Sequence, residues 1–434
     1  MTKTRNQNLE FPAELEITPD FKRAFEMMEE TRQSAFITGR AGTGKSTLLR
    51  YFKENTAKNA VVVAPTGVAA INVRGQTIHS FFQFPPKLIH KDNVRRLKNS
   101  KIFEKMDTLV IDEVSMVRAD VLDGIDYSLR LNRENLDEPF GGVQVILFGD
   151  MFQLPPIVDR EAKEFLSLSY ATPYFFSANV FQKFSLKYIE LNKIFRQKDE
   201  EFLNLLEKIR NKQADETDLV RINSQVSQTE LDHREVITLT TTNHLAHSIN
   251  EKELRKLPHP EAKFDAQVLG KFEENTFPTE YSLRLKKNAQ IMLLRNDEHR
   301  RWVNGTIATV HDVQENAIQI KVEKKVYDLP RVKWEKIEYT FNELEGKIEE
   351  KVVGSFEQFP LRLAWAITIH KSQGQTFENV VIDFGHGAFA HGQAYVALSR
   401  CVSLKGITLK RPLMLRDIIL DQRILKFRAH FLED

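Results

Sequence analysis

Short apolar runs alternate with longer amphipathic stretches along the first 185 residues of the chain. Four of these runs are rich in β-branched residues, and each is followed by a polar or glycine-containing turn, which is typical of strands buried on both faces of a sheet. They occupy residues 34–38, 60–65, 108–112 and 143–150. Because amphipathic stretches between buried strands indicate crossover helices, this part of the chain predicts a parallel α/β domain.

A second region with the same alternation begins at residue 187. Its pattern predicts strands over 187–192 and 235–243, and helices over 200–211 and 244–257. The parallel-sheet pattern then stops and resumes only at residues 363–384. We therefore expect a second parallel α/β domain that is interrupted by a region of another kind.

The interrupting region, residues 290–356, consists of short alternating segments with turns at Asn304-Gly305 and Glu315-Asn316. This pattern predicts a small antiparallel barrel. The expected fold class is α/β, with two parallel-sheet domains and one inserted barrel. We place the first domain at 1–184, with a small insertion near 70–105, the second at 185–295 and 357–434, and the barrel at 296–356.

Composition narrows the class of protein without naming it. The chain has 434 residues, of which 41% are hydrophobic and 28% charged, as in ordinary globular proteins. It contains no apolar run of about 18 residues, so we expect no membrane span. One cysteine, Cys401, excludes an internal disulfide and a cysteine-based zinc site. A net charge of +2 does not by itself indicate a nucleic-acid partner.

Residues 39–47 read GRAGTGKST and match the phosphate-loop pattern G-x-x-x-x-G-K-[ST] at every fixed position. A predicted strand precedes the loop and a predicted helix follows it. The glycines let backbone N–H groups turn towards phosphate oxygens, and the helix start adds its positive dipole end. With Lys45 on the β- and γ-phosphates and the Ser46 hydroxyl on Mg²⁺, the expected nucleotide contacts are Gly39, Ala41, Gly42, Thr43, Gly44, Lys45, Ser46 and Thr47.

Two later strand ends carry residues suited to hydrolysis. Asp112 and Glu113 end the run at 108–112, where Asp112 is placed to hold the water shell of Mg²⁺ and Glu113 to polarise the attacking water. Gln153 follows the run at 143–150 and precedes a stiff Leu-Pro-Pro segment, so we expect it to contact the γ-phosphate or the water. An Asp-Glu pair or a turn glutamine is common alone; their order after a matched phosphate loop favours the functional interpretation.

Seven segments together resemble a known family. They occur in the order found in superfamily-one helicases of the Pif–RecD branch and read GRAGTGKST, APTGVAA, IDEVSM, PFGGVQVILFGDMFQLPP, IFRQ, AITIHKSQGQT and YVALSR. The fourth segment, with residues 118–137 before it, is similar to the Pif side in particular. The likeness covers nearly the whole chain, which resembles a bare bacterial helicase core. It implies two RecA-like domains with ATP between them and an SH3-like inserted barrel.

The resemblance also implies that arginines of the second domain complete the ATP site. Arg196 in IFRQ and Arg400 in YVALSR match the two positions, and Gly374 lies in the element that couples the nucleotide to DNA. Guanidinium groups stabilise charge on the transferring phosphoryl group, although either arginine could instead form an internal salt bridge. This chain has Phe21 where the family commonly has an adenine-reading glutamine. That leaves Gln7 or backbone groups to read the base, and favours core packing for Phe21.

In this family single-stranded DNA crosses the tops of both RecA-like domains, where strand ends and helix starts contact phosphates. The matching positions of this chain are Pro65, Thr66, Gly67, Val68, Thr77, His79 and Ser80 on the first domain and Asn243, His244, Thr368, His370, Lys371 and Ser372 on the second. Four aromatic residues either stack on bases or belong to the core, namely Phe81, Phe82, Phe84 and Trp302.

The sequence therefore predicts an ATP-dependent DNA helicase that uses ATP and Mg²⁺ and acts on single-stranded and tailed duplex DNA. The family likeness implies 5′ to 3′ movement and extends the substrates to G-quadruplexes and RNA–DNA hybrids. We expect a monomer in solution, in the bacterial cytoplasm with the nucleoid. The alternatives are a translocase that displaces bound proteins without efficient unwinding, or a DNA-binding scaffold with an inactive nucleotide site. A GTPase is disfavoured because no N-K-x-D motif occurs.

Overall fold

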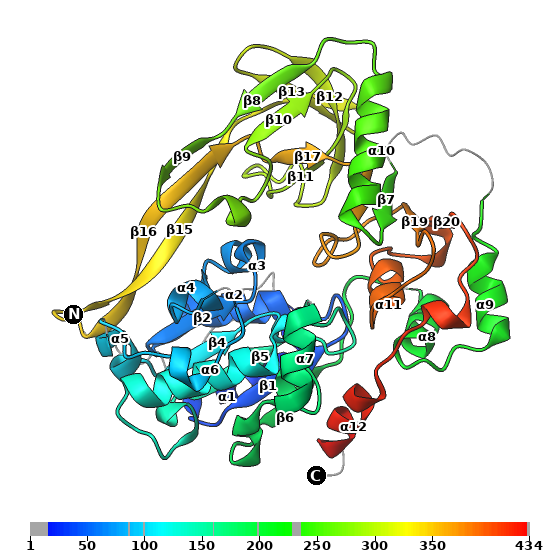
Figure 1. The fold of residues 1–434 in the computed structure, drawn as a ribbon. Helices are drawn as coiled ribbons and strands as arrows, with labels where there is room; N and C mark the ends of the chain where they lie inside the picture. The colour runs from blue at the N-terminus through cyan, green and yellow to red at the C-terminus, as the bar shows by residue number, and fades with distance from the viewer. Residues whose placement is uncertain are drawn as a thin grey trace.

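A computed structural model describes residues 16–431, except residues 86, 99, 159, 198 and 228–235. Its first large element is a six-stranded parallel sheet with the order β3-β2-β4-β5-β1-β6 (Figure 1). The strands are β1 (Ala35–Gly39), β2 (Ala60–Ala64), β3 (Gln76–Thr77), β4 (Thr108–Ile111), β5 (Gln144–Phe148) and β6 (Lys187–Leu191). The four runs predicted as buried strands are β1, β2, β4 and β5.

Helices cover both faces of this sheet because successive residues of a strand point to opposite sides. On one face, α1 (Pro19–Glu30) and α2 (Lys45–Asn55) pack on the sheet, and Phe25 and Phe52 join Ile37 in one buried cluster. Phe21 belongs to the same cluster and is 5% exposed, as its expected packing role requires. The opposite face is covered by α5 (Ser100–Lys105) and α6 (Ala119–Asn132), where Leu122 packs in the cluster of alternate strand residues.

The strand β6 lies on the other side of the expected domain boundary. It pairs in parallel with β1, from Ala35 opposite Lys187 to Gly39 opposite Leu191. The boundary expected after residue 184 is therefore wrong for this strand, which completes the first sheet. A two-residue alternation indicates a strand but not the sheet that it joins, because the neighbouring strand lies far away in sequence.

The second parallel sheet has four strands in the order β18-β7-β19-β20. They are β7 (Ile237–Thr240), β18 (Ala366–Thr368), β19 (Val380–Asp383) and β20 (Ile407–Leu409). The accompanying helices are α8 (Glu200–Arg210), α9 (Glu216–Asn223), α10 (Asn243–Lys256) and α11 (Gln393–Leu398). Helix α10 packs on β7 and β18, and α8 packs on α11 (Figure 1). The second parallel domain is thus present.

Antiparallel strands lie in sequence between β7 and β18 and form sheets β10-β8, β14-β13-β12-β11-β17 and β15-β16-β9. Their bounds are β8 (Ala262–Asp265), β9 (Gln267–Gly270), β10 (Ser282–Leu285), β11 (Gln290–Leu293), β12 (Ile307–Val313), β13 (Ile318–Val322), β14 (Lys325–Leu329), β15 (Val332–Asn342), β16 (Lys347–Gln358) and β17 (Leu361–Leu363). The antiparallel region therefore extends beyond the expected 296–356 on both sides, because four-residue strands are too short to show a clear alternation. Trp302 is 6% exposed and belongs to the core of this region.

The hairpin of β15 and β16 reaches back to the first sheet (Figure 1). Tyr339 on β15 is 5% exposed, and its hydroxyl accepts a hydrogen bond from the backbone N–H of Val62 at 3.2 Å. The backbone N–H of Tyr339 donates to the side-chain oxygen of Gln76 at 3.2 Å. Lys53 of α2 pairs with Glu350 of β16 at 2.6 Å. These contacts fix the antiparallel region against the edge of the first sheet.

The expected insertion near 70–105 consists of short elements that include α3 (Gly67–Asn72), β3, α4 (Ile78–Phe81) and α5. Phe81, Phe82 and Phe84 are buried and belong to the first core, so they are not exposed for base stacking. The remaining helices are α7 (Arg160–Ser169) and α12 (Gln422–His430). Within the described residues, no helix combines the length and apolar character needed to cross a bilayer.

Candidate nucleotide site and nucleic-acid contacts

The phosphate loop lies between β1 and α2, as the sequence predicts. Gly42 and Gly44 adopt φ angles of 82° and 90°, in the left-handed region that favours glycine, and Gly44 directly precedes the first residue of α2. The Thr43 hydroxyl donates to the carbonyl of Arg40 at 2.9 Å and closes the loop. Ser46 lies in the first turn of α2 with an exposed side chain, next to Thr47.

The Lys45 ammonium lies inside this loop. It donates hydrogen bonds to the carbonyls of Gly39 at 2.6 Å and Arg40 at 3.0 Å. Burial lowers the pKa of Lys45, although the negative charges of Asp150 and Glu113 act in the opposite direction. An ammonium group surrounded by backbone at the end of a parallel strand is suited to bind phosphoryl oxygens.

The acid pair follows β4 directly, and both side chains are partly buried. Burial, together with the charge of Glu113, raises the pKa of Asp112 to about 7. Burial also raises the pKa of Glu113, while Lys45 and Arg400 oppose that rise. Two adjacent carboxyl groups in a poorly hydrated cleft favour a proton or a cation between them. This is the chemistry required of a water-activating group beside a divalent cation.

The residues present fit a magnesium ion held mainly by its nucleotide. Among the described residues, no group of three His, Cys, Asp or Glu side chains could hold a metal ion alone. Mg²⁺ commonly binds through one or two protein oxygens, phosphate oxygens and water. The Ser46 hydroxyl and the Asp112 carboxylate are oxygen donors of this kind, and a divalent cation would offset the raised pKa of Asp112.

Gln153 is 7% exposed and has hydrogen-bond partners from both halves of the cleft. Its amide nitrogen donates to the Asp150 carboxylate at 3.2 Å, in the loop after β5. Its side-chain oxygen accepts a hydrogen bond from the Gln373 amide at 3.4 Å, in the segment after β18. The side chain is therefore positioned by residues that belong to two different sheets.

Arg196 packs on the phosphate loop from the segment after β6. A Cβ atom on Gly42 would lie 2.5 Å from the Cβ of Arg196, and the N–H of Phe195 donates to the Gly42 carbonyl at 2.9 Å. Its guanidinium donates to the carbonyls of Ser399 at 3.4 Å and Gly374 at 3.5 Å. Because β6 belongs to the first sheet, the expectation that the second domain carries Arg196 is corrected: this arginine lies where the two sheets meet.

Arg400 is 1% exposed, and among the residues that the structure describes its hydrogen bonds go to neutral groups. It donates to the Val396 carbonyl at 2.9 Å, the Ser399 hydroxyl at 2.9 Å and the Ser372 carbonyl at 3.4 Å. Burial and the nearby charge of Arg196 lower its pKa to about 9, so it stays protonated at neutral pH. Within the described part of the chain, no carboxylate pairs with Arg400, which excludes the salt-bridge alternative there. The charges of Glu113 and Asp150 favour the protonated form of Arg400 without forming a salt bridge with it. A buried charge of this kind is costly and is characteristic of functional sites.

The DNA-contacting residues expected on the first sheet lie at the starts of two short helices. The Thr66 hydroxyl accepts a hydrogen bond from the N–H of Ala69 at 3.2 Å and caps α3, whose first turn includes Val68, 48% exposed. The Thr77 hydroxyl accepts from the N–H of Ser80 at 3.2 Å and caps α4. Pro65 precedes the first cap. Helix starts are suited to bind phosphate.

The antiparallel region lies close to one of these helix starts. A Cβ atom on Gly67 would lie 2.7 Å from the Cβ of Thr276, so the two chains touch there. An open cavity of about 360 Å³ adjoins the contact, and Thr77 and Lys336 are among its lining residues. His79 is partly buried, and this burial lowers the pKa of its imidazole. The helix starts of the first sheet are therefore partly covered in this arrangement.

On the second sheet, Asn243 and His244 are exposed in the first turn of α10. The Thr242 hydroxyl before them caps this helix and accepts from the N–H of Leu245 at 3.3 Å. Both side chains therefore lie at the surface, and their contact with a phosphate stays a prediction.

The segment after β18 divides into exposed and buried positions. Lys371 is exposed and His370 is partly buried, which lowers the pKa of its imidazole. Thr368 is 3% exposed and Ser372 is fully buried, with the Ser372 hydroxyl donating to the Ile369 carbonyl at 2.7 Å. This burial contradicts the predicted DNA contacts by the side chains of Thr368 and Ser372. The sequence of the turn has no regular period, so it does not show which of its residues face inwards.

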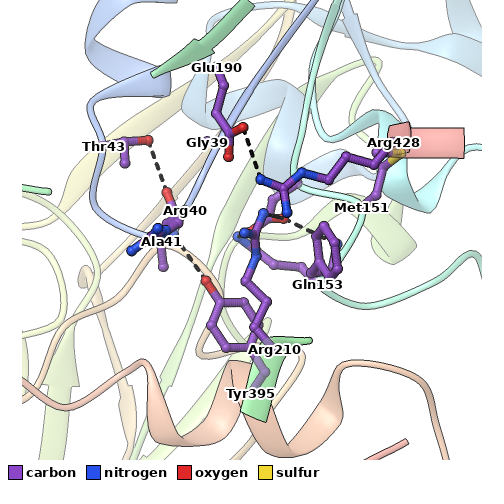
Figure 2. A network of polar contacts seen from close by, with 12 residues as sticks. Gly39, Arg40, Ala41, Thr43, Met151, Gln153, Glu190, Arg210, Tyr395 and Arg428 are labelled. Carbon is purple, nitrogen blue, oxygen red and sulfur yellow. Dashed lines mark hydrogen bonds and ion pairs between the residues drawn. The ribbon is translucent and has the colours of Figure 1, made fainter. Parts of the chain in front are cut away.

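Three residues near the ATP cleft are absent from the sequence-based prediction, and Figure 2 shows two of them, Tyr395 and Arg210. The Tyr395 hydroxyl accepts a hydrogen bond from the N–H of Ala41 at 3.4 Å. The His391 imidazole lies 2.9 Å from the carbonyl of Met151. Arg210 enters the same cluster from the end of α8. Tyr395 lies within YVALSR and was available to the sequence argument, whereas a lone arginine in an amphipathic helix gives no such signal. Gln7, a possible adenine contact, lies outside the described residues.

A phosphate loop on a parallel sheet, an acid pair at a second strand end and an arginine from a second parallel sheet define a P-loop ATPase built from two RecA-like units. Both the fold and the cleft indicate a P-loop ATPase, but neither alone shows which process the hydrolysis of ATP drives.

Comparison with known proteins supplies the family. Residues 17–219 match the model of the PIF1-like helicases. The ATP-dependent DNA helicase Pif1 of Bdellovibrio bacteriovorus is 31% identical over 96% of this chain and 93% of its own length. The human ATP-dependent DNA helicase PIF1 is 33% identical over 92% of this chain, which spans 61% of the human protein. This chain therefore belongs to the PIF1-like helicases, which are ATP-dependent DNA helicases.

Solved structures of Pif1 from Bacteroides agree with the fold. The unliganded protein is 37% identical and superposes with a TM-score of 0.89, covering 97% of this chain and 98% of its own. The complex with ADP-AlF4 also gives 0.89 over 96% and 98% of the two chains. The complex with single-stranded DNA is 38% identical over the same shares and gives only 0.70. The arrangement of this chain is thus closer to the unliganded and ADP-AlF4-bound structures.

Proposed function

We propose that this chain hydrolyses ATP with Mg²⁺ between its two parallel sheets and uses the cycle to move 5′ to 3′ along single-stranded DNA. The observation that carries the proposal is that segments following strands of both sheets contact one another beside the phosphate loop. Gln373 of the second sheet contacts Gln153 of the first, and Arg196 bonds to the Ser399 and Gly374 carbonyls beyond it. A change at the phosphate site therefore alters the spacing of the sheets.

In the proposed reaction, the chain's own residues orient the phosphates and the attacking water. Lys45 and the loop N–H groups bind the β- and γ-phosphates. Glu113, whose pKa is raised by burial, accepts a proton from the water. Gln153 holds that water, or the γ-phosphate, in line for attack.

The negative charge that develops on the phosphoryl oxygens is stabilised by Arg196, which lies where the two sheets meet, and by Arg400 of the second half. Ser46 and Asp112 would hold Mg²⁺, which supplies further neutralisation of the phosphate charge when bound. Stabilisation by Arg400 requires no reorganisation of its side chain, because three hydrogen bonds already fix its guanidinium.

Single-stranded DNA is the proposed partner, bound across the starts of α3 and α10. Exposed side chains at both places, and Lys371 between the sheets' ends, support this path. Bacteroides Pif1 has been solved bound to single-stranded DNA, and two coordinating Pif1 helicases have been solved with forked double-stranded DNA. Tailed duplexes are accordingly the first substrates to test, followed by G-quadruplexes and RNA–DNA hybrids; a monomer is the expected species in solution.

The decisive experiment compares unwinding of 5′-tailed and 3′-tailed duplexes of identical sequence with ATP and Mg²⁺. We expect displaced strand only from the 5′-tailed duplex, and none from either with Lys45→Ala. Displacement from the 3′ tail alone would overturn the polarity. If neither duplex is unwound while ATP hydrolysis remains stimulated by DNA, the protein-displacing translocase becomes the better description, and removal of streptavidin from a biotinylated strand would detect it.

A further inference from the structure

The loop that carries Gln153, residues 150–153, is contacted by the second half of the molecule along its whole length. The imidazole of His391 receives the N–H of Asp421 on Nδ1 at 3.3 Å, so Nε2 carries the proton and donates to the carbonyl of Met151 at 2.9 Å. Gly392 has a φ of 71°, and a Cβ atom there would collide with the carbonyls of Phe152 and Gln153. The backbone of loop 150–153 is therefore pressed against the segment that opens α11.

Arg210, the last residue of α8, contacts the side chains of the same loop. It is 3% exposed, and its Nη2 lies 3.4 Å from the Asp150 carboxylate. Its guanidinium lies over the ring of Phe152, 3.9 Å from the ring centroid. The other oxygen of Asp150 accepts the hydrogen bond from the Gln153 amide at 3.2 Å. A continuous chain of contacts thus runs from α8 to the side chain of Gln153.

The charges in this chain of contacts depend on one another. Asp150 is 1% exposed; burial alone would raise its pKa, but Arg210 and Lys45 outweigh burial and hold it below its usual range. The same helix also contacts the phosphate loop, because Glu207 pairs with Arg40 at 3.1 Å. Helix α8 therefore meets the two loops that surround the transferred phosphate.

The geometry of the pair differs from that of a buried ion pair elsewhere in the chain. Arg411, in the segment after β20, donates to both oxygens of Asp417 at 2.8 Å. Arg210 makes one long bond to Asp150, and its Nη1 forms a second long ion pair with Glu207 at 3.5 Å, while within the described residues its Nε has no hydrogen-bond partner. A pair that serves stability alone gains from full hydrogen bonding, whereas an incompletely bonded pair is easier to separate when the sheets move.

We propose that Arg210 is a positioning residue for ATP hydrolysis: through Asp150 it holds the Gln153 amide in its working orientation and so makes hydrolysis depend on the position of α8. This inference rests on the proposed role of Gln153. Displacement of α8 with the second half of the molecule removes the charge that holds Asp150, and the Gln153 amide then loses its fixed acceptor. Product release and hydrolysis are thereby linked to the same helix.

The test uses the full chain and measures steady-state ATP hydrolysis with and without single-stranded DNA. Because Arg210→Met alone leaves the buried carboxylate of Asp150 without its arginine, the informative variant is Arg210→Met combined with Asp150→Asn, which removes both charges. We expect its DNA-stimulated kcat to fall by at least about tenfold, since even a small misplacement of the Gln153 amide is enough to slow a reaction that depends on orientation. KM for ATP should stay within about threefold, because the phosphate loop is unchanged. Arg210→Lys, which keeps the charge, should recover part of kcat.

The matched control is Arg411→Met, which breaks a buried pair outside the cleft. Its melting temperature should fall while its DNA-stimulated kcat stays at the wild-type value. If the double variant keeps kcat within about twofold while Gln153→Ala loses it, the role of Arg210 is overturned and that of Gln153 stands. If Gln153→Ala itself keeps kcat, the proposed function of Gln153 fails first. A loss of kcat in the double variant that only follows its loss of folded protein also overturns the inference.

Discussion

The ATP cleft and the strand ends that we propose bind DNA are built in opposite ways. In the cleft, Arg400 and Gln153 are 1% and 7% exposed and are held by hydrogen bonds from the protein. At the strand ends, Asn243, His244 and Lys371 are exposed. Charge in the cleft is buried, which costs folding free energy. Charge at the strand ends is exposed to water, so its cost in folding free energy is small. Substitutions in the cleft should therefore lower turnover, whereas those at the strand ends should lower only affinity.

The largest effect is expected for Lys45→Ala. Loss of the ammonium removes the positive charge from the centre of the phosphate loop, so kcat for ATP should fall by on the order of a hundredfold or more. Affinity for single-stranded DNA, measured by fluorescence anisotropy, should remain within about twofold because the strand ends are untouched. Lys53→Ala on the same helix is the control and should keep kcat. Hydrolysis that survives in Lys45→Ala would refute the cleft assignment.

Arg400→Met should separate activity from stability. Removing the guanidinium should lower kcat by about a hundredfold or more, as for other arginines that stabilise a transferring phosphoryl group. The melting temperature should stay equal or rise, because a buried charge that forms no salt bridge within the described residues is replaced by an apolar side chain of similar length. Calorimetry beside an ATPase assay measures both. A marked drop in melting temperature would mean that Arg400 is structural.

A smaller effect is expected where the strand ends meet DNA. The double variant Asn243→Ala with His244→Ala should weaken binding of single-stranded DNA roughly tenfold, the value of one or two hydrogen bonds to a charged phosphate. Its melting temperature should not change, because Thr242 still caps α10. His247→Ala, exposed one turn further along the same helix, provides the comparison. Equal affinities of the two variants would remove α10 from the DNA path.

The smallest effects distinguish neighbouring residues after β18. Lys371→Ala should reduce the slope of log affinity against log salt concentration by about 0.7, the amount expected for one phosphate contact on a single strand. Ser372→Ala should leave both affinity and slope unchanged, because its hydroxyl is buried and bonded to Ile369. Titrations at several salt concentrations test both variants. A slope change in Ser372→Ala would restore that residue to the DNA contacts.

Contiguous motifs were predicted well because their chemistry is local. The phosphate loop needs only residues 39–47 and the strand and helix beside them, and the acid pair needs only the end of β4. The family likeness then placed Arg196 and Arg400 near the nucleotide. Their detailed environments differ from expectation, since the strand before Arg196 joins the first sheet.

Contacts between distant segments could not be predicted from the sequence. Nothing in the amphipathic helix 200–211 distinguishes Arg210, which becomes notable only when Asp150 is found beside it. In the same way, alternation alone could not show that Ser372 faces inwards while Lys371 faces out. Each of these properties depends on which elements meet, and a single sequence records the elements but not their pairing.

The separation of β7 from β18 has a consequence for how the chain acquires its structure. These strands are adjacent in the second sheet, yet the whole antiparallel region lies between them in sequence. Closing so long a loop costs conformational entropy before the pairing can form. If the antiparallel strands form first, their ends come together and β18 joins β7 at little further cost. Pulsed hydrogen exchange should therefore show protection of β12 and β13 before β7, and the reverse order would contradict this sequence of events.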